Sequence, residues 1–201
     1  MEVSAEMVKQ LREQTGAGIM DCKKALQENN GDFAKATEYL RKKGIVAAQK
    51  RSTRETGEGI IDAYIHPGSR LGVLIEVNCE TDFVANTSEF RRFVRDMAMQ
   101  VAASNPLVIS REQLAPEIIE REMEIYRTQA KESGKPDHVV EKIVQGKVEK
   151  FYQDVCLLEQ SYIRDPEKTV QDVLTEITAK LGENIQIKRF VRFHLGEDQQ
   201  K

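Results

Sequence analysis

The sequence predicts an α+β fold, in which a small helical N-terminal domain precedes a small antiparallel β-sheet covered by helices. The main observation is a change in the spacing of apolar residues along the chain. Up to Leu40 they recur every three or four positions, as on one face of a helix; from Ile60 to Cys79 they recur every second position, as on one face of a strand. Pro67–Gly68 interrupts the second pattern, which is typical of a hairpin turn.

Three short helices are expected near the N-terminus. Ser4 can cap the first helix, and Thr15–Gly18 ends it. Asn29–Asp32 forms a turn before the third helix, which Gly44 ends. The apolar stripes of these helices would form a small common core. They consist of Met7, Val8 and Leu11, then Ile19, Cys22, Ala25 and Leu26, and finally Phe33, Ala36 and Leu40.

A polar segment separates these helices from the rest of the chain. Val46–Gly59 is rich in Lys, Arg, Thr and Glu and shows little periodicity, so we expect a helical tail that runs into a linker. The sequence therefore predicts two domains, a helical domain at residues 1–50 and an α+β core at residues 51–201.

The core is expected to contain a three-stranded antiparallel sheet. Ile185–Leu195 alternates apolar and polar residues as a third strand, and it should join the hairpin because a two-stranded ribbon alone is marginal. Asn86 and Glu89 can cap the helix that follows the hairpin. Helical apolar spacing is present at Phe90–Met97, Ile119–Ala130, Val140–Phe151 and Val170–Leu181.

Phe83 stands beside Asp82 in the connection between the second strand and the following helix. A large aromatic side chain is unusual there, because connections run over the surface and are mostly polar. Phe83 either folds back into the core or is held out as an anchor for a partner. From residue types alone burial is favoured, since most aromatic residues of a globular domain lie inside.

Three blocks of the sequence resemble the elongation factor Ts family. Glu76–Asn86 contains the motif Thr-Asp-Phe-Val, Leu11–Leu26 matches a second block, and Leu157–Val170 resembles the segment before the last core helix. The resemblance, to a short bacterial form, implies a guanine-nucleotide exchange factor. Such a protein binds elongation factor Tu with GDP, displaces Mg²⁺ and promotes GDP release so that GTP can bind. It also implies that Phe83 is an anchor.

The resemblance further implies two sets of partner-binding residues. Those that would dislocate Mg²⁺ from elongation factor Tu are Thr81, Asp82, Phe83 and Val84. Those of the N-terminal helices, which resemble a ubiquitin-associated domain, are Arg12, Ile19 and Met20. From the residues alone, Ile19 and Met20 could equally be buried in the small helical core, and Arg12 could be an exposed residue without a partner.

We expect no catalytic site, cofactor or metal site in the chain itself, so the protein should not be an enzyme. There is no Gly-x-x-x-x-Gly-Lys-Ser/Thr loop for a nucleotide. The histidines have no neighbouring nucleophile, and the cysteines lack the spacing of a zinc site or a disulfide framework. These residues are His66, His138 and His194, and Cys22, Cys79 and Cys156.

Composition also limits the partners. A net charge of −3 and a pI of about 5.8 argue against direct nucleic-acid binding, and the basic cluster Arg41–Arg54 is better explained as a solvated linker. The sequence shows neither a signal peptide nor an apolar run long enough to span a membrane, and the cysteines suit reduced thiols. We therefore expect a cytoplasmic protein without a membrane partner.

Two further hypotheses concern binding. An adaptor, with a ubiquitin-associated-type module and a dimerisation core, is the alternative function, although an adaptor has no need to present the Thr81–Val84 turn. The second hypothesis is a homodimer. Long family members contain two related core subdomains and this chain only one, and the edge strand Ile185–Leu195 would leave backbone groups unpaired unless a second copy covered it.

Overall fold

The computed structural model describes residues 3–134 and 136–197 and shows an α+β fold, as the sequence predicts. The chain divides into two compact units. The first comprises Met1–Ile61, Glu76–Val94 and Asp172–Lys188; the second comprises Asp62–Ile75, Arg95–Gln171 and Arg189–Lys201. The described helices include none that is both long enough and apolar enough to span a membrane.

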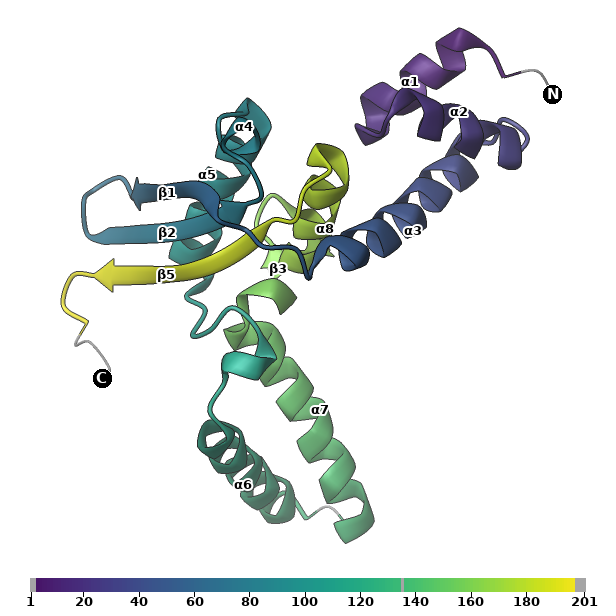
Figure 1. Ribbon diagram of the computed structural model, residues 1–201. Coiled ribbons are helices and arrows are strands. Elements are labelled where there is room, and N and C mark those ends of the chain that lie inside the picture. Colours follow the sequence, from purple (N-terminus) through teal and green to yellow (C-terminus); the bar gives the residue numbers. More distant parts are fainter. Residues whose placement is uncertain (1–2, 135, 198–201) are drawn as a thin grey trace. The chain divides into compact units, whose positions relative to one another are not determined.

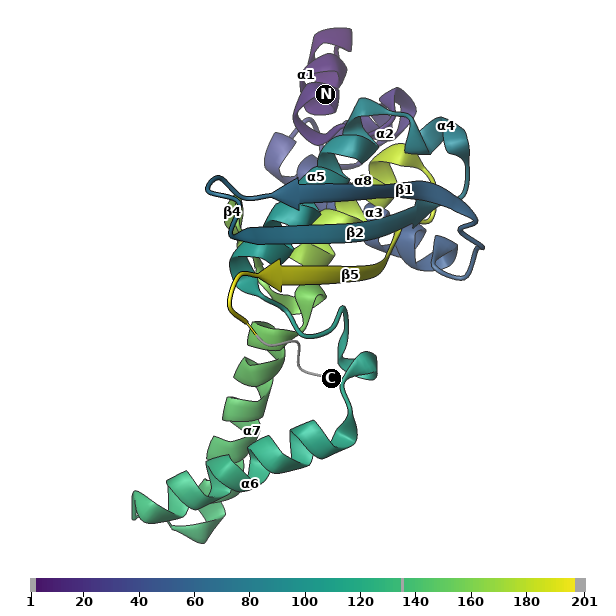
Figure 2. The same ribbon diagram turned by 90° about the vertical axis from the view of Figure 1, so that its left-hand side faces the viewer.

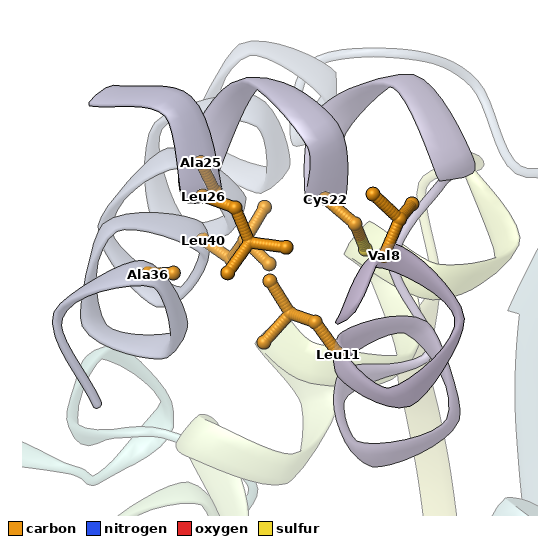
Figure 3. Close-up of a cluster of buried hydrophobic side chains, with 7 residues drawn as sticks. All are labelled: Val8, Leu11, Cys22, Ala25, Leu26, Ala36 and Leu40. Carbon is orange, nitrogen blue, oxygen red and sulfur yellow. The ribbon is translucent and has the colours of Figure 1, made fainter. Parts of the chain in front are cut away.

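The first unit begins with the three expected helices, α1 (Ala5–Thr15), α2 (Ile19–Glu28) and α3 (Phe33–Arg51) (Figure 1). The Ser4 hydroxyl caps α1 by accepting a hydrogen bond from the backbone N–H of Met7 at 3.2 Å, and Gly16 ends α1 at a φ of 68°. The helices share a buried core (Figure 3), made of Val8, Leu11, Cys22, Ala25, Leu26, Ala36 and Leu40. The predicted apolar stripes thus account for this core.

Helix α3 is longer than predicted. Gly44 lies inside the helix instead of ending it, and the helical tail predicted after Val46 continues α3 to Arg51. A Cβ atom at Gly44 would lie 3.3 Å from the Cβ of Ala179, so glycine serves here to let α3 approach α8 (Val170–Leu181) closely. Arg41 also forms an ion pair with Asp172 of α8 at 3.2 Å. The domain boundary at residues 50 and 51 stays a prediction.

The main sheet has the strand order β1 (Glu58–Ile65), β2 (Leu71–Cys79) and β5 (Gln186–His194) (Figure 2), which confirms that the third strand joins the hairpin. On the central strand β2 the predicted alternation holds, since the side chains of Val73, Ile75, Val77 and Cys79 are buried. Gly59 has a φ of 147°, and a Cβ there would lie 2.3 Å from the carbonyl oxygen of Val77. Only glycine fits this close crossing.

Strand β5 departs from the predicted alternation. Ile187 is buried, but Lys188 and Arg189 are both exposed, so the pattern shifts by one residue. Because a shift of one residue exchanges the two faces of a strand, the apolar side chains that were predicted to face the core beyond it are exposed to solvent. They are Val191, Phe193 and Leu195.

In the second unit, the exposed end of β5 lines an open apolar hollow of about 530 Å³. We call its exposed apolar side chains the outer apolar patch. They are Ala63, Ile65, Leu74, Phe193 and Leu195.

The second unit also contains a helical hairpin, α6 (Pro116–Glu132) and α7 (Asp137–Val155) (Figure 1). Its core is separate from the others and includes Ala130, Val140, Val144 and Val148. At its base the guanidinium of Arg111 pairs with Glu149 at 2.7 Å and with Glu159.

The remaining elements are α4 (Asp82–Ala85), α5 (Ser88–Ser104), the 3₁₀ turns Arg111–Gln113 and Leu157–Glu159, and the small strands β3 (Ser161–Tyr162) and β4 (Asp165–Thr169).

Candidate functional site

The turn after β2 is a short helix with a defined cap. Helix α4 follows Thr81, whose backbone is extended and whose hydroxyl accepts a hydrogen bond from the N–H of Val84 at 3.4 Å. Behind the turn, the thiol of Cys79 donates to the carbonyl oxygen of Thr81 at 3.1 Å. At the far end, the side-chain amide of Asn86 donates to the carbonyl oxygen of Asp82 at 2.9 Å. The conformation of Thr81–Ala85 is therefore fixed by local hydrogen bonds.

Phe83 projects from this helix into solvent. Its side chain is 83% exposed, the highest value among the large exposed apolar residues of the described chain. The interpretation of Phe83 as part of the core is therefore wrong. Ala85 is buried on the opposite side of α4, and Val84 is half-buried, so α4 is anchored through these residues while Phe83 and Asp82 face outward. An exposed phenylalanine beside a carboxylate suits an apolar pocket with a polar rim on a partner.

A residue that sequence reasoning missed holds the turn from behind. Glu183 lies in the loop between α8 and β5, and one of its carboxylate oxygens accepts hydrogen bonds from the backbone N–H groups of Glu80 and Thr81, both at 3.1 Å. The other oxygen accepts from the Thr81 hydroxyl at 2.6 Å. No local pattern could have shown this, because the partners lie more than a hundred positions apart in the sequence.

The same carboxylate affects Cys79. Burial, and then the negative charge of Glu183, raise the pKa of the Cys79 thiol to about 11. The thiol therefore stays neutral at physiological pH and keeps the proton that it donates to Thr81. This supports the view of Cys79 as a structural side chain. Cys22, Cys79 and Cys156 are all buried and unpaired.

The cap of the next helix differs from the prediction. Thr87, not Asn86, caps α5, because its hydroxyl accepts a hydrogen bond from the N–H of Phe90 at 3.2 Å. The side chain of Asn86 is instead used by α4. Glu89 does not complete a capping box; its carboxylate accepts from the hydroxyl of Ser88 and pairs with Lys180 at 3.8 Å, and these contacts lower its pKa.

The predicted N-terminal contact residues are also on the surface. Ile19 and Met20, in the first turn of α2, are 54% and 73% exposed, so their burial in the helical core is wrong. Arg12 is exposed in the last turn of α1, just before the connection to α2. The three residues thus flank one connection in the sequence, and exposed apolar residues together with an arginine are typical of a protein-binding surface.

Two of the three histidines and a further hollow lie elsewhere in the described chain. Within residues 3–134 and 136–197 no three His, Cys, Asp or Glu side chains are grouped as metal ligands. His66 shares a hydrogen bond of 2.9 Å with the hydroxyl of Tyr64, and His194 lies 3.5 Å from the carboxylate of Glu197. An open polar hollow of about 510 Å³, lined by residues such as Gln153 and Gln160, has neither histidine nor cysteine in its lining.

Comparison with known proteins gives one consistent result. The family model described as "Elongation factor TS" matches residues 4–197. The protein named elongation factor Ts from Thermoanaerobacter sp. (strain X514) is 62% identical over 195 residues, which cover 97% of this chain and 96% of the relative. Elongation factor Ts of Caldanaerobacter subterraneus subsp. tengcongensis is 60% identical over 199 residues, which cover 99% of this chain and 100% of the relative. That of Geotalea daltonii is 56% identical over 201 residues, covering 100% and 93%.

Proposed function

Because the chain belongs to the elongation factor Ts family, whose members promote nucleotide exchange on elongation factor Tu, we propose that it does so through the turn that carries Asp82 and Phe83. It binds elongation factor Tu with GDP, displaces Mg²⁺ and promotes GDP release so that GTP can bind. The observation that carries this proposal is the exposure of Phe83 on a helix that hydrogen bonds hold in one conformation. The adaptor alternative has no such observation in its favour.

The energetic task defines what the turn must do. A GTPase that binds GDP with nanomolar affinity gains about 12 kcal/mol, and much of this comes from its contacts with the phosphates and Mg²⁺. An exchange factor therefore has to bind the nucleotide-free partner more tightly than the loaded one. By linkage, GDP weakens the binding of the factor by the same ratio by which the factor weakens the binding of GDP.

The exposed residues of the turn suit this task. Phe83 enters an apolar pocket of the partner's G domain beside the Mg²⁺ site, and Asp82 adds a carboxylate at the rim. Displacing the elements that hold Mg²⁺ leaves the phosphate charge poorly compensated, so GDP departs. Thr81 and Val84 keep the turn in shape, Thr81 as the cap of α4 and Val84 as its half-buried support.

The N-terminal helices provide a second contact. We propose that this ubiquitin-associated-like domain, residues 1–50, binds the G domain through Arg12, Ile19 and Met20, whose side chains are all exposed. Two linked contacts bind more tightly than either alone, because the second forms at a high effective concentration. We place the protein in the cytoplasm, with elongation factor Tu and a second copy of itself as partners, and without nucleic acid, membrane or cofactor.

The direct test is the release of fluorescently labelled GDP from elongation factor Tu. We expect the protein to accelerate release at substoichiometric amounts, because each molecule leaves its partner once GTP has bound. Unchanged release at saturating protein would contradict the proposal. Pull-down with ubiquitin, compared with nucleotide-free elongation factor Tu, tests the adaptor alternative in the same preparation.

We also propose that the protein is a homodimer through its core. Strand β5 is at an edge of the sheet and carries Phe193 of the outer apolar patch, so an isologous contact about a two-fold axis would cover both. Each protomer keeps its own Phe83, and the dimer therefore holds two partner molecules.

Light scattering over a dilution series should give twice the mass of one chain, which is 22.9 kDa. Phe193→Glu, within the patch, should yield monomers because it places a charge in an apolar contact. Ile125→Glu changes a side chain that is also exposed, on α6, and should leave the dimer intact. A mass of 22.9 kDa at all micromolar concentrations excludes the dimer.

A further inference from the structure

We infer that Glu183 is a positioning residue of the exchange site: its carboxylate fixes the turn so that Asp82 and Phe83 project toward the partner. The inference rests on the proposed function and extends it to a loop far away in the sequence. Glu183 is half-buried, and within the described residues its carboxylate accepts hydrogen bonds from Glu80 and Thr81, so it acts on the turn and not on the partner.

The hydrogen bonds of Glu183 determine the cap of α4. A hydroxyl has one proton to donate and two lone pairs with which to accept. The Thr81 hydroxyl donates its proton to Glu183 at 2.6 Å, which leaves a lone pair for the N–H of Val84. Glu183 therefore orients the hydroxyl in the way that capping requires. Because its acceptor oxygens are charged, these bonds are stronger than those of a neutral group.

Helix α4 depends on such support. It has four residues, from Asp82 to Ala85, and a helix of this length is unstable without outside contacts, because nucleation is unfavourable. Two backbone N–H groups that precede the helix, those of Glu80 and Thr81, are also satisfied by Glu183. Without the carboxylate the turn loses three hydrogen bonds at once, and Phe83 is no longer held in one direction.

The neighbouring residue fixes the loop that carries Glu183. The N–H of Asn184 donates to the carboxylate of Glu80 at 2.6 Å, and its side-chain amide donates to the carbonyl oxygen of Arg54 at 2.8 Å. Arg54 in turn pairs with Glu80 at 3.4 Å. Asn184 is buried, with 3% of its surface exposed. The loop is thus tied to the turn and to the segment after α3, which makes Glu183 a rigid support.

The test compares the rate of GDP release from elongation factor Tu in the presence of the unmodified protein and of its Glu183 variants. Glu183→Ala removes all three acceptor contacts and should lower the release rate at subsaturating protein by about tenfold, since lost charged hydrogen bonds leave the turn without its orientation. Glu183→Gln keeps a carbonyl oxygen and should lose less. Glu89→Gln is the matched control, because it also neutralises a glutamate that contacts α8 through Lys180 but does not touch the turn.

A double-mutant cycle with Phe83→Ala separates positioning from general stabilisation. If Glu183 acts through Phe83, Glu183→Ala should cost little further activity once Phe83 is gone. An equal loss in both backgrounds, or Glu183 variants as active as the wild type, would overturn the inference while leaving the proposed function intact. If the wild type does not accelerate GDP release from elongation factor Tu, the proposed function itself is overturned. Circular dichroism at the assay temperature confirms that each variant is folded.

Discussion

Replacing Phe83 with alanine is expected to remove most of the exchange activity while leaving the protein folded. The side chain is 83% exposed, so its loss removes almost no core contact. In the complex it would fill a pocket at the centre of the interface, where truncation of an aromatic anchor costs about 2 kcal/mol or more, a factor of about 30. GDP release and the melting temperature are to be measured on one preparation.

Phe90 is the matched control for this variant. It is seven positions further along the chain but fully buried, at 0% exposure. Phe90→Ala should lower the free energy of unfolding by about 3–5 kcal/mol, because it leaves a cavity in the core. Exchange should then be lost only as the protein unfolds. The assignment of Phe83 as an anchor fails if Phe83→Ala lowers the melting temperature as much as Phe90→Ala does, or if it leaves exchange unchanged.

Removing residues 1–50 is expected to weaken binding to elongation factor Tu by about a hundredfold, the gain that a second linked contact typically gives. The remaining core should fold. The buried cluster of the N-terminal helices, from Val8 to Leu40, lies entirely within the removed part, so no other core loses a member. The new surface on α8 includes the regions that Gly16, Arg41 and Gly44 cover, around Lys180, Asp172 and Ala179.

Point variants of the same surface show which contact is responsible. Ile19→Ala combined with Met20→Ala keeps the helices folded, because both side chains are exposed, and should reproduce most of the loss of affinity. Isothermal calorimetry measures the affinity of the truncated protein and of the double variant for nucleotide-free elongation factor Tu. An unfolded core, or undiminished binding by the truncated protein, would contradict the division at residue 50. Normal binding by the point variants would place the contact elsewhere on the helices.

Elements that depend on local spacing were predictable from the sequence. The three N-terminal helices and the hairpin follow from periodicity and turn residues, and the structure contains them. Gly44 shows where local signals fail: glycine near basic residues indicates a helix end, but here it allows α3 to lie against Ala179, a contact that no local pattern encodes. The same holds for the cap of α5, because Asn86 and Thr87 are both good capping residues. The side chain of Asn86 is hydrogen-bonded to Asp82 of α4, so Thr87 caps α5.

The site was predictable only in part. A strand followed by Thr-Asp-Phe-Val places the turn, and resemblance to a family assigns its role, but exposure of Phe83 depends on which side of α4 meets the core. Residue types alone favoured burial of Phe83 in the core. Glu183 could not be found at all, because its contact with Thr81 joins positions 102 residues apart. On β5, the two consecutive exposed residues Lys188 and Arg189 show that a regular alternation can shift within one strand.

The ordered turn has a consequence for the speed of the encounter. Association rates of proteins that dock without rearranging are about 10⁵–10⁷ M⁻¹s⁻¹, and they fall when a segment must first change conformation. Hydrogen bonds already hold Thr81–Ala85 in one conformation in the free chain, so a conformational change of this turn should not slow association with the partner. In the proposed exchange reaction, recognition of the partner therefore requires no folding step at this turn.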